Sequence, residues 1–156
     1  MKKQTKTGII FLAVSVLLPC LFLALFLHEN ITPQKMPLET AAELTHVTEY
    51  GIEHADILDG MILLQGWLLE TPDTILSINR NFILSDGART YKLNTVLQKR
   101  EDITTRWNNG NNYDNSGLEG SCLASSLEKG RYRIGFLITD AVNKRYYLTD
   151  EYLEVH

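Results

Sequence analysis

The stretch that decides the fold is residues 127–140, LEKGRYRIGFLITD. It opens with a Glu-Lys-Gly turn and then carries apolar or aromatic side chains at every second position, namely Tyr132, Ile134, Phe136 and Ile138. Alternate residues of a β-strand point to the same face of a sheet, so this spacing places the four side chains together. A strand with so apolar a face is expected to lie in the centre of a sheet.

The start of this strand has the spacing Leu127-x-x-Gly130-x-Tyr132. This spacing is typical of a tyrosine corner, in which a tyrosine hydroxyl bonds to backbone a few residues upstream and fixes a crossing between two sheets. The pattern therefore predicts a Greek-key arrangement of strands around residues 131–139.

Short strand-like segments surround this one along the chain. Residues 85–88, Ser-Asp-Gly-Ala, form a hairpin signal because Asp-Gly accepts a positive φ. No segment of the body has a helical period, and turn residues recur at near-regular spacing. The fold class expected for residues 45–156 is all-β, an antiparallel immunoglobulin-like β-sandwich, with a closed barrel as the alternative. The expected strands are residues 46–57, 61–69, 75–84, 89–97, 102–107, 118–127, 131–139 and 145–155.

The N-terminal part reads as a membrane anchor. Residues 9–27 are uncharged and long enough to span a bilayer as one helix, kinked at Pro19. Lys2, Lys3 and Lys6 precede this run, so the positive-inside rule places residues 1–8 in the cytoplasm and the body outside it. We expect a single-pass protein of the bacterial inner membrane, in contact with lipid through residues 9–27, with a periplasmic or extracellular domain.

Two other interpretations of the anchor stay open. A cleaved signal peptide would need small residues directly after the apolar run, which instead ends in Leu-Phe-Leu-His-Glu. A lipoprotein signal would need a small residue before Cys20, where Pro19 stands. Residues 28–44 contain Pro33 and Pro37 and are expected to form an extended linker, with a helical turn or two after Pro37.

Charge and cysteine content limit which functions are possible. The chain has 156 residues and a net charge of -4; the first seven residues carry +3, so the rest carries -7. An acidic body argues against nucleic acid as a partner. Cys20 lies in the apolar run and Cys122 in the body, so no internal disulfide is expected. Cys122 is expected to be a small buried residue, with a disulfide between chains as the alternative.

One polar loop, residues 108–117, has the composition of a binding site. Its amides could contact a sugar whose apolar face stacks on aromatic rings; it could also hold Ca²⁺, or be a solvated hairpin loop. The spacing does not fit an EF-hand, whose sixth position is glycine, because Tyr113 stands there. Trp67 is expected in the core, and Trp107 as an exposed ring. The candidate binding residues are Trp107, Asn111, Asn112, Tyr113 and Asp114.

The other polar residues are expected to have structural roles and not catalytic ones. Arg100 is expected to pair with Glu119 or Asp114 and to fix the base of the loop. His46, His54 and His156 lack the spacing of metal ligands, and no nucleophile-base pair or phosphate loop is visible. We therefore expect neither a metal nor a cofactor, and no enzymatic activity. A hydrolase or transferase with an unrecognised site is the alternative.

The segment from residue 100 to residue 135 resembles a known class of module. Arg100-x-Asp102-Ile103, Ser116-Gly117-Leu118 and Leu127-x-x-Gly130-x-Tyr132-x-Ile134-Gly135 occur in that order. This order is similar to that of small β-sandwich modules associated with bacterial cell-surface polysaccharide glycosyltransferases, with Ile103 in place of valine and Leu118 in place of phenylalanine. Because no transferase domain is present, the resemblance implies an accessory role in envelope glycan assembly or modification.

Together these features favour a membrane-anchored extracytoplasmic binding or accessory module. Its expected partner is another membrane protein or an envelope polysaccharide. A second hypothesis is a structural subunit of a multi-protein envelope complex, which pairs with its neighbour through an exposed sheet edge.

Overall fold

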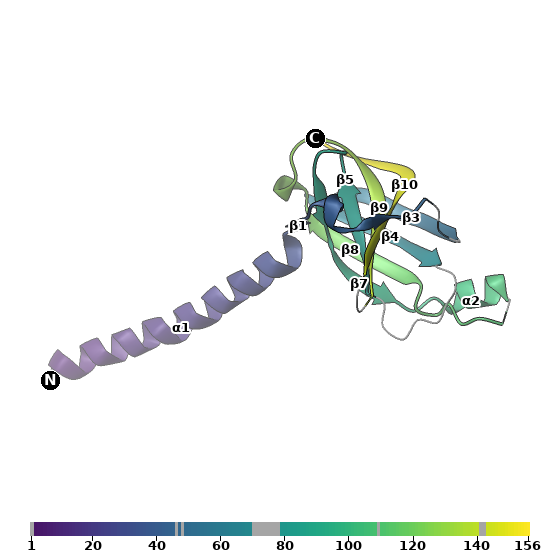
Figure 1. Ribbon diagram of the computed structural model, residues 1–156. Helices are drawn as coiled ribbons and strands as arrows, with labels where there is room; N and C mark the ends of the chain where they lie inside the picture. Colours follow the sequence, from purple (N-terminus) through teal and green to yellow (C-terminus); the bar gives the residue numbers. More distant parts are fainter. Residues whose placement is uncertain (1, 46, 48, 70–78, 109, 141–142) are drawn as a thin grey trace. The chain divides into compact units, whose positions relative to one another are not determined.

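The computed structural model describes residues 2–45, 47, 49–69, 79–108, 110–140 and 143–156 (Figure 1). The chain divides into two compact units, Met1–Ile31 and Thr32–His156. The first is an apolar helix and the second a two-sheet β-domain, called the body below.

The first unit is the helix α1 (Lys2–Ile31), which contains Pro19. Its segment Ile10–Ile31 has a mean hydropathy of 2.9 and is long and apolar enough to cross a membrane. A signal sequence near an N-terminus has the same features. The apolar helix expected at residues 9–27 is thus present and extends further at both ends.

The body consists of two sheets (Figure 1). One has the strand order β1-β6-β5-β9-β10-β2 and the other the order β3-β4-β8-β7. All these pairs are antiparallel except β10–β2, which is parallel. The strands are β1 (Gln34–Lys35), β2 (Ala42–Glu43), β3 (Glu49–Leu58), β4 (Met61–Leu69), β5 (Asn79–Ser85), β6 (Thr90–Lys92), β7 (Asn94–Gln98), β8 (Gly117–Leu123), β9 (Gly130–Thr139) and β10 (Lys144–Val155).

Strand β9 lies within the stretch 127–140, which decides the fold. It pairs with β5 on one side and β10 on the other, so the expected central position is confirmed. Its alternating residues Tyr132, Ile134, Phe136 and Ile138 are all fully buried. They pack against side chains of the second sheet, including Ile62 of β4 and Cys122 of β8, in one common core.

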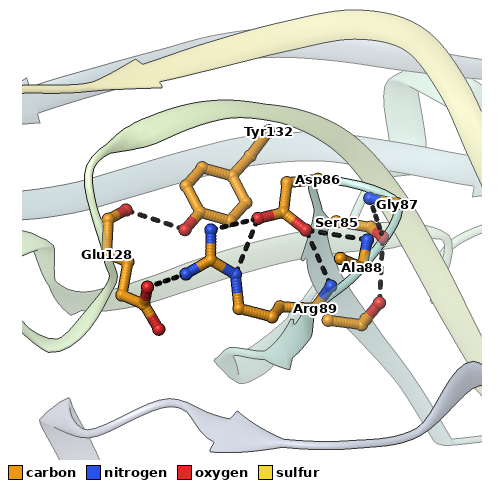
Figure 2. Close-up of polar contacts among 8 residues, drawn as sticks. Ser85, Asp86, Gly87, Ala88, Arg89, Glu128 and Tyr132 are labelled. Carbon is orange, nitrogen blue, oxygen red and sulfur yellow. Dashed lines mark hydrogen bonds and ion pairs between the residues drawn. The ribbon is translucent and has the colours of Figure 1, made fainter.

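The tyrosine corner is present at the start of β9 (Figure 2). The hydroxyl of Tyr132 donates a hydrogen bond of 2.7 Å to the backbone carbonyl of Glu128. The Glu128 carboxylate also pairs with Arg89, which in turn donates to Asp86 at 2.8 Å through its Nε. One side chain therefore links the corner to the turn between β5 and β6.

That turn confirms the Asp-Gly hairpin signal. Asp86 Oδ1 accepts the backbone N–H groups of Ala88 at 2.9 Å and of Arg89 at 2.7 Å (Figure 2). Gly87 has a φ of 90°, which glycine adopts without a Cβ penalty. Burial alone would raise the pKa of Asp86, but these bonds and the guanidinium of Arg89 outweigh it and lower that pKa.

The segment expected as a strand at residues 102–107 is instead the helix α2 (Glu101–Trp107). Ile103, Thr105 and Trp107 alternate as in a strand, but Ile103 and Trp107 also stand four apart, which is one face of a helix. Thr105 donates its hydroxyl to the Glu101 carbonyl at 2.9 Å. The helix ends at Asn108, whose φ of 34° is left-handed.

Other expected boundaries were also wrong. The strand expected at residues 89–97 is split into β6 and β7, which belong to different sheets. Between them Leu93 donates its N–H to the Phe82 carbonyl at 3.0 Å. The strand expected at residues 118–127 ends at Leu123, and a 3₁₀ turn, Ala124–Ser126, follows. Of the strand expected at residues 75–84, only the part from Asn79 lies within the described residues.

The expected linker is also part of the body from Thr32 onward. β1 pairs with β6, and β2 pairs with the start of β10. Leu44 donates its N–H to the Tyr146 carbonyl at 2.8 Å. The expected helical turn is the 3₁₀ helix Leu38–Thr40. Extended, proline-containing segments keep enough backbone donors and acceptors to cover a sheet edge, so their composition did not reveal this role.

Candidate functional site

The outer face of the sheet β3-β4-β8-β7 carries both α2 and an open groove. Along β4, Ile62, Leu64 and Leu68 point into the core between the sheets. Leu63, Gln65, Trp67 and Leu69 point the other way, because neighbouring residues of a strand alternate. One half of this outer face lies under α2 and the other half is open to solvent.

The covered half is built around Trp67, which is only 6 % exposed. A Cβ at Gly51, its partner in β3, would lie 2.6 Å from Nε1 of the indole, so the ring needs glycine there. Trp107 of α2 meets Trp67 edge to face, with ring centroids 5.2 Å apart. Leu69, Ile103 and Tyr113 complete this cluster, which we call the α2 cap.

Arg100 fixes the α2 cap to the far edge of the sheet. Its Cγ lies over Gly117, where a Cβ would come within 2.5 Å. Its guanidinium donates to both carboxylate oxygens of Glu53, at 2.7 and 2.9 Å, and to both of Asp102, at 2.7 and 2.9 Å. The bonds from Arg100 lower the pKa of Asp102 to about 2. This arrangement ties the start of α2 to β3.

The partners expected for Arg100 were wrong. Asp114 contacts it through its backbone carbonyl, which accepts the Arg100 N–H at 2.7 Å. Glu119 instead accepts a hydrogen bond of 2.9 Å from the Gln98 amide. Glu53 lies far from Arg100 in the sequence, and only the sheet brings the two together.

The polar loop after α2 folds back on the helix through side chains. Thr104 donates its hydroxyl to Asp114 Oδ1 at 2.6 Å and accepts the Tyr113 N–H at 2.8 Å. Asn112 Oδ1 accepts the Asp114 N–H at 2.8 Å, and Asn111 donates to the Tyr113 hydroxyl at 3.2 Å. These bonds tie the loop to α2 and brace residues 111–114 against one another.

The five candidate binding residues therefore lie together, but most of them support the α2 cap. Tyr113 is 4 % exposed, and Trp107, expected as an exposed ring, is half-buried against Trp67. Asn111 and Asn112 are exposed, while Asp114 is half-buried and bonded to Thr104. Among the described residues no group of three His, Cys, Asp or Glu is placed to hold a metal ion.

A small pocket of about 100 Å³ lies beside the α2 cap. Its wall includes the buried Arg80, which donates to the Asn115 carbonyl at 3.0 Å and so holds the end of the loop. The other lining residues are Leu68, Leu69, Asn112, Tyr113, Asn115 and Ser116. The space suits a few water molecules.

The open half of the outer face was not expected from the sequence. A groove of about 450 Å³ crosses it, lined by His54, Asp56, Ile57, Leu58, Leu63, Leu64, Gln65 and Glu119. Leu58 is 60 % exposed and Leu63 is 37 % exposed. The large apolar side chains exposed on this sheet are Ile57, Leu58, Leu63, Val96 and Leu97, whereas Tyr152 is exposed on the other sheet. In β4, the consecutive apolar residues 61–64 were a signal that both of its faces carry apolar side chains.

Comparison of the chain with protein-family models, with curated proteins and with solved structures found no match.

Proposed function

We propose that this protein is a membrane-anchored extracytoplasmic module that binds a partner protein, as an accessory component of bacterial envelope glycan assembly or modification. The observation that carries the proposal is the open half of the outer sheet face, where exposed leucines surround a groove. Exposed apolar patches on a soluble domain mark interaction sites. The apolar helix α1 would tether the body to the membrane in which such machinery works.

The geometry favours a protein over a polysaccharide as the partner. Polysaccharide sites present aromatic rings and free amides, whereas Tyr113 is buried and Trp107 packs on Trp67. Within the described part of the loop, the exposed amides are Asn108, Asn111, Asn112 and Asn115. The order of the three sequence motifs supports the envelope context. Within these motifs, Arg100 packs over Gly117 and pairs with Glu53, and Tyr132 bonds to the Glu128 carbonyl, so the three residues stabilise the body.

The proposal includes an immunoglobulin-like topology and a cytoplasmic N-terminus. The strand orders β3-β4-β8-β7 and β6-β5-β9-β10 support it, because they match the A-B-E-D and C′-C-F-G sheets of that fold. Tyr132, near the start of β9, then takes the position of the tyrosine corner. The lysines before the apolar run support the orientation.

The test is crosslinking of the full-length protein in its native membrane, followed by mass spectrometry of what co-purifies. We expect one stoichiometric membrane protein of the envelope glycan machinery. The variant Leu63→Gln should lose it, and Tyr152→Gln, a matched change on the other sheet, should keep it. Recovery of lipid and glycan alone, with loss of glycan in Asn111→Ala or Asn112→Ala, would replace this proposal by direct polysaccharide binding.

A second candidate is a structural subunit that pairs through a sheet edge, and β10 supports it. β2 covers β10 only at Arg145 and Tyr146, so no described strand pairs with this side of β10 from Tyr147 to Val155. Strand addition at such an edge uses backbone hydrogen bonds. Crosslinks that start from β10 and survive Leu63→Gln would favour this candidate.

A further inference from the structure

Charge is divided unequally between the two sheets. Strands β3, β4, β7 and β8 contain no lysine or arginine, whereas they carry Glu49, Glu53, Asp56 and Glu119. The strands of the other sheet carry both signs: the acidic residues Glu43, Asp150, Glu151 and Glu154, and the basic residues Lys35, Arg80, Lys92, Arg131, Arg133, Lys144 and Arg145. The outer face of the smaller sheet is therefore apolar and acidic.

Within the groove, two of these carboxylates are available to a cation. Asp56 and Glu119 are exposed, and neither forms an ion pair within the described part of the chain. One oxygen of Glu119 accepts the Gln98 amide at 2.9 Å, a neutral hydrogen bond that leaves the charge of the carboxylate unpaired. In the strand register Leu63 lies beside Asp56, and Gln65 lies between His54 and Glu119. The apolar side chain of Leu63 on β4 is thus flanked by the Asp56 carboxylate on β3, and the Glu119 carboxylate lies on β8 at the other side of the groove.

The α2 cap shows what this face accepts. On the neighbouring half, a short helix places Ile103 and Trp107 against the sheet. Beside it, the Arg100 guanidinium reaches the acidic edge at Glu53. Asp56 stands three residues further along the same strand, on the open half.

We propose that the open half binds a cationic amphipathic helix of a partner protein, with apolar residues on Leu58 and Leu63 and lysine or arginine on Asp56 and Glu119. This inference rests on the proposed function and adds the chemistry of the partner segment. Complementary charge would set orientation and encounter rate, while the leucines would supply the buried contact.

The direct test measures binding of synthetic helices to the full-length protein in nanodiscs of uncharged phosphatidylcholine. The probes are a Leu/Lys amphipathic peptide of about four turns, a Leu/Glu peptide of the same period, and a Leu/Lys peptide with its apolar face scrambled. Binding to empty nanodiscs is subtracted. We expect saturable binding of the first peptide and at least about tenfold weaker binding of the other two.

Variants locate the contact. Leu63→Gln should weaken binding of the Leu/Lys peptide about tenfold, whereas Tyr152→Gln should leave it unchanged. Asp56→Asn combined with Glu119→Gln should weaken it and flatten its salt dependence, because exposed charges are screened by salt. Fluorescence of Trp67 and Trp107 reports that the α2 cap is intact in each variant.

Three results would overturn the inference: no saturable binding, equal binding of the Leu/Glu peptide, or equal losses in Leu63→Gln and Tyr152→Gln. The crosslinking test answers the proposed function separately. If it yields a partner that depends on Leu63 while the peptides fail to bind, the face is an interface but its partner is not a cationic helix. A crosslink between two copies of this chain through residue 63 would also overturn the inference.

Discussion

At the scale of single residues, Tyr132 makes the bond on which the β9 entry depends. Its ring is fully buried and its hydroxyl donates to the Glu128 carbonyl at 2.7 Å. Tyr132→Phe keeps the ring and leaves that acceptor without this donor, so we expect a loss of about 1–2 kcal/mol in the free energy of unfolding. Tyr152→Phe, on an exposed ring, should change it by less than about 0.5 kcal/mol.

The measurement is urea unfolding in detergent, followed by tryptophan fluorescence, since Trp67 and Trp107 both lie in the body. Equal stability of the Tyr132→Phe variant and the wild type would show that the corner is a packing feature and not a hydrogen-bonded one.

Asp86 gives the body a defined response to acid. Its pKa is lowered in the folded state from an unfolded value of 3.8. A carboxylate with a lowered folded pKa stabilises the fold above the unfolded value, and that contribution is lost as pH falls through the folded value. We expect the urea concentration at the unfolding midpoint to fall as the pH is lowered below about 4. In Asp86→Asn this fall should be smaller. Parallel acid profiles for the two proteins would contradict this assignment.

Cys122 is fully buried, and burial raises the pKa of its thiol to about 12. Thiolate is the reactive form, so the folded protein should resist maleimide at about pH 8. In a Cys20→Ser background we expect labelling only in denaturant, as measured by mass spectrometry. Stoichiometric labelling of the folded protein would show an accessible thiol and would revive a disulfide between chains.

At the scale of elements, the α2 cap depends on the absence of a side chain at residue 51. In Gly51→Ala the new Cβ would overlap the Trp67 indole, so we expect a loss of about 1–3 kcal/mol and a changed tryptophan emission spectrum. Gly130→Ala is the matched control, because the nearest atom to its Cβ, Cε2 of Tyr132, is 3.8 Å away. If both variants unfold alike, the close approach of Gly51 and Trp67 is not what holds the cap.

The elements also show where sequence patterns succeed and fail. β4 is a nearly continuous apolar run and β9 follows a period of two, both lie beside strong turn residues, and both match the expected ranges within a residue. The sequence predicts a strand where α2 lies, because Ile103, Thr105 and Trp107 fit both periods over so short a segment. The break at Leu93 carries no local sign, since a strand that changes sheets keeps its apolar alternation.

The nearness of the five candidate binding residues follows from the sequence, whereas their contacts do not. The five loop residues do gather at one end of the sheet. Trp107, however, packs on Trp67, which is distant in sequence. Tyr113 and Asp114 both bond to Thr104, a residue whose type gave no signal. The pairing of Arg100 with Glu53 follows from strand order alone. Such contacts between distant segments lie beyond single-sequence patterns.

At the scale of the whole molecule, composition indicated the apolar N-terminal helix and a strand-rich acidic body. It did not reveal that the basic residues of the strands all lie in one of the two sheets, because that division appears only when β3, β4, β7 and β8 are known to be neighbours. The same grouping defines the open half, whose lining residues come from β3, β4 and β8.

The most direct test of this account places a photoreactive residue at position 63, or at position 152 as the control, in the full-length protein in its native membrane. We expect the photoreactive residue at position 63 to form an adduct with one discrete protein, and the one at position 152 to form none. Adducts from position 152 alone, or from neither position, would contradict the claim that this protein acts by binding a partner through the open half of its four-stranded sheet.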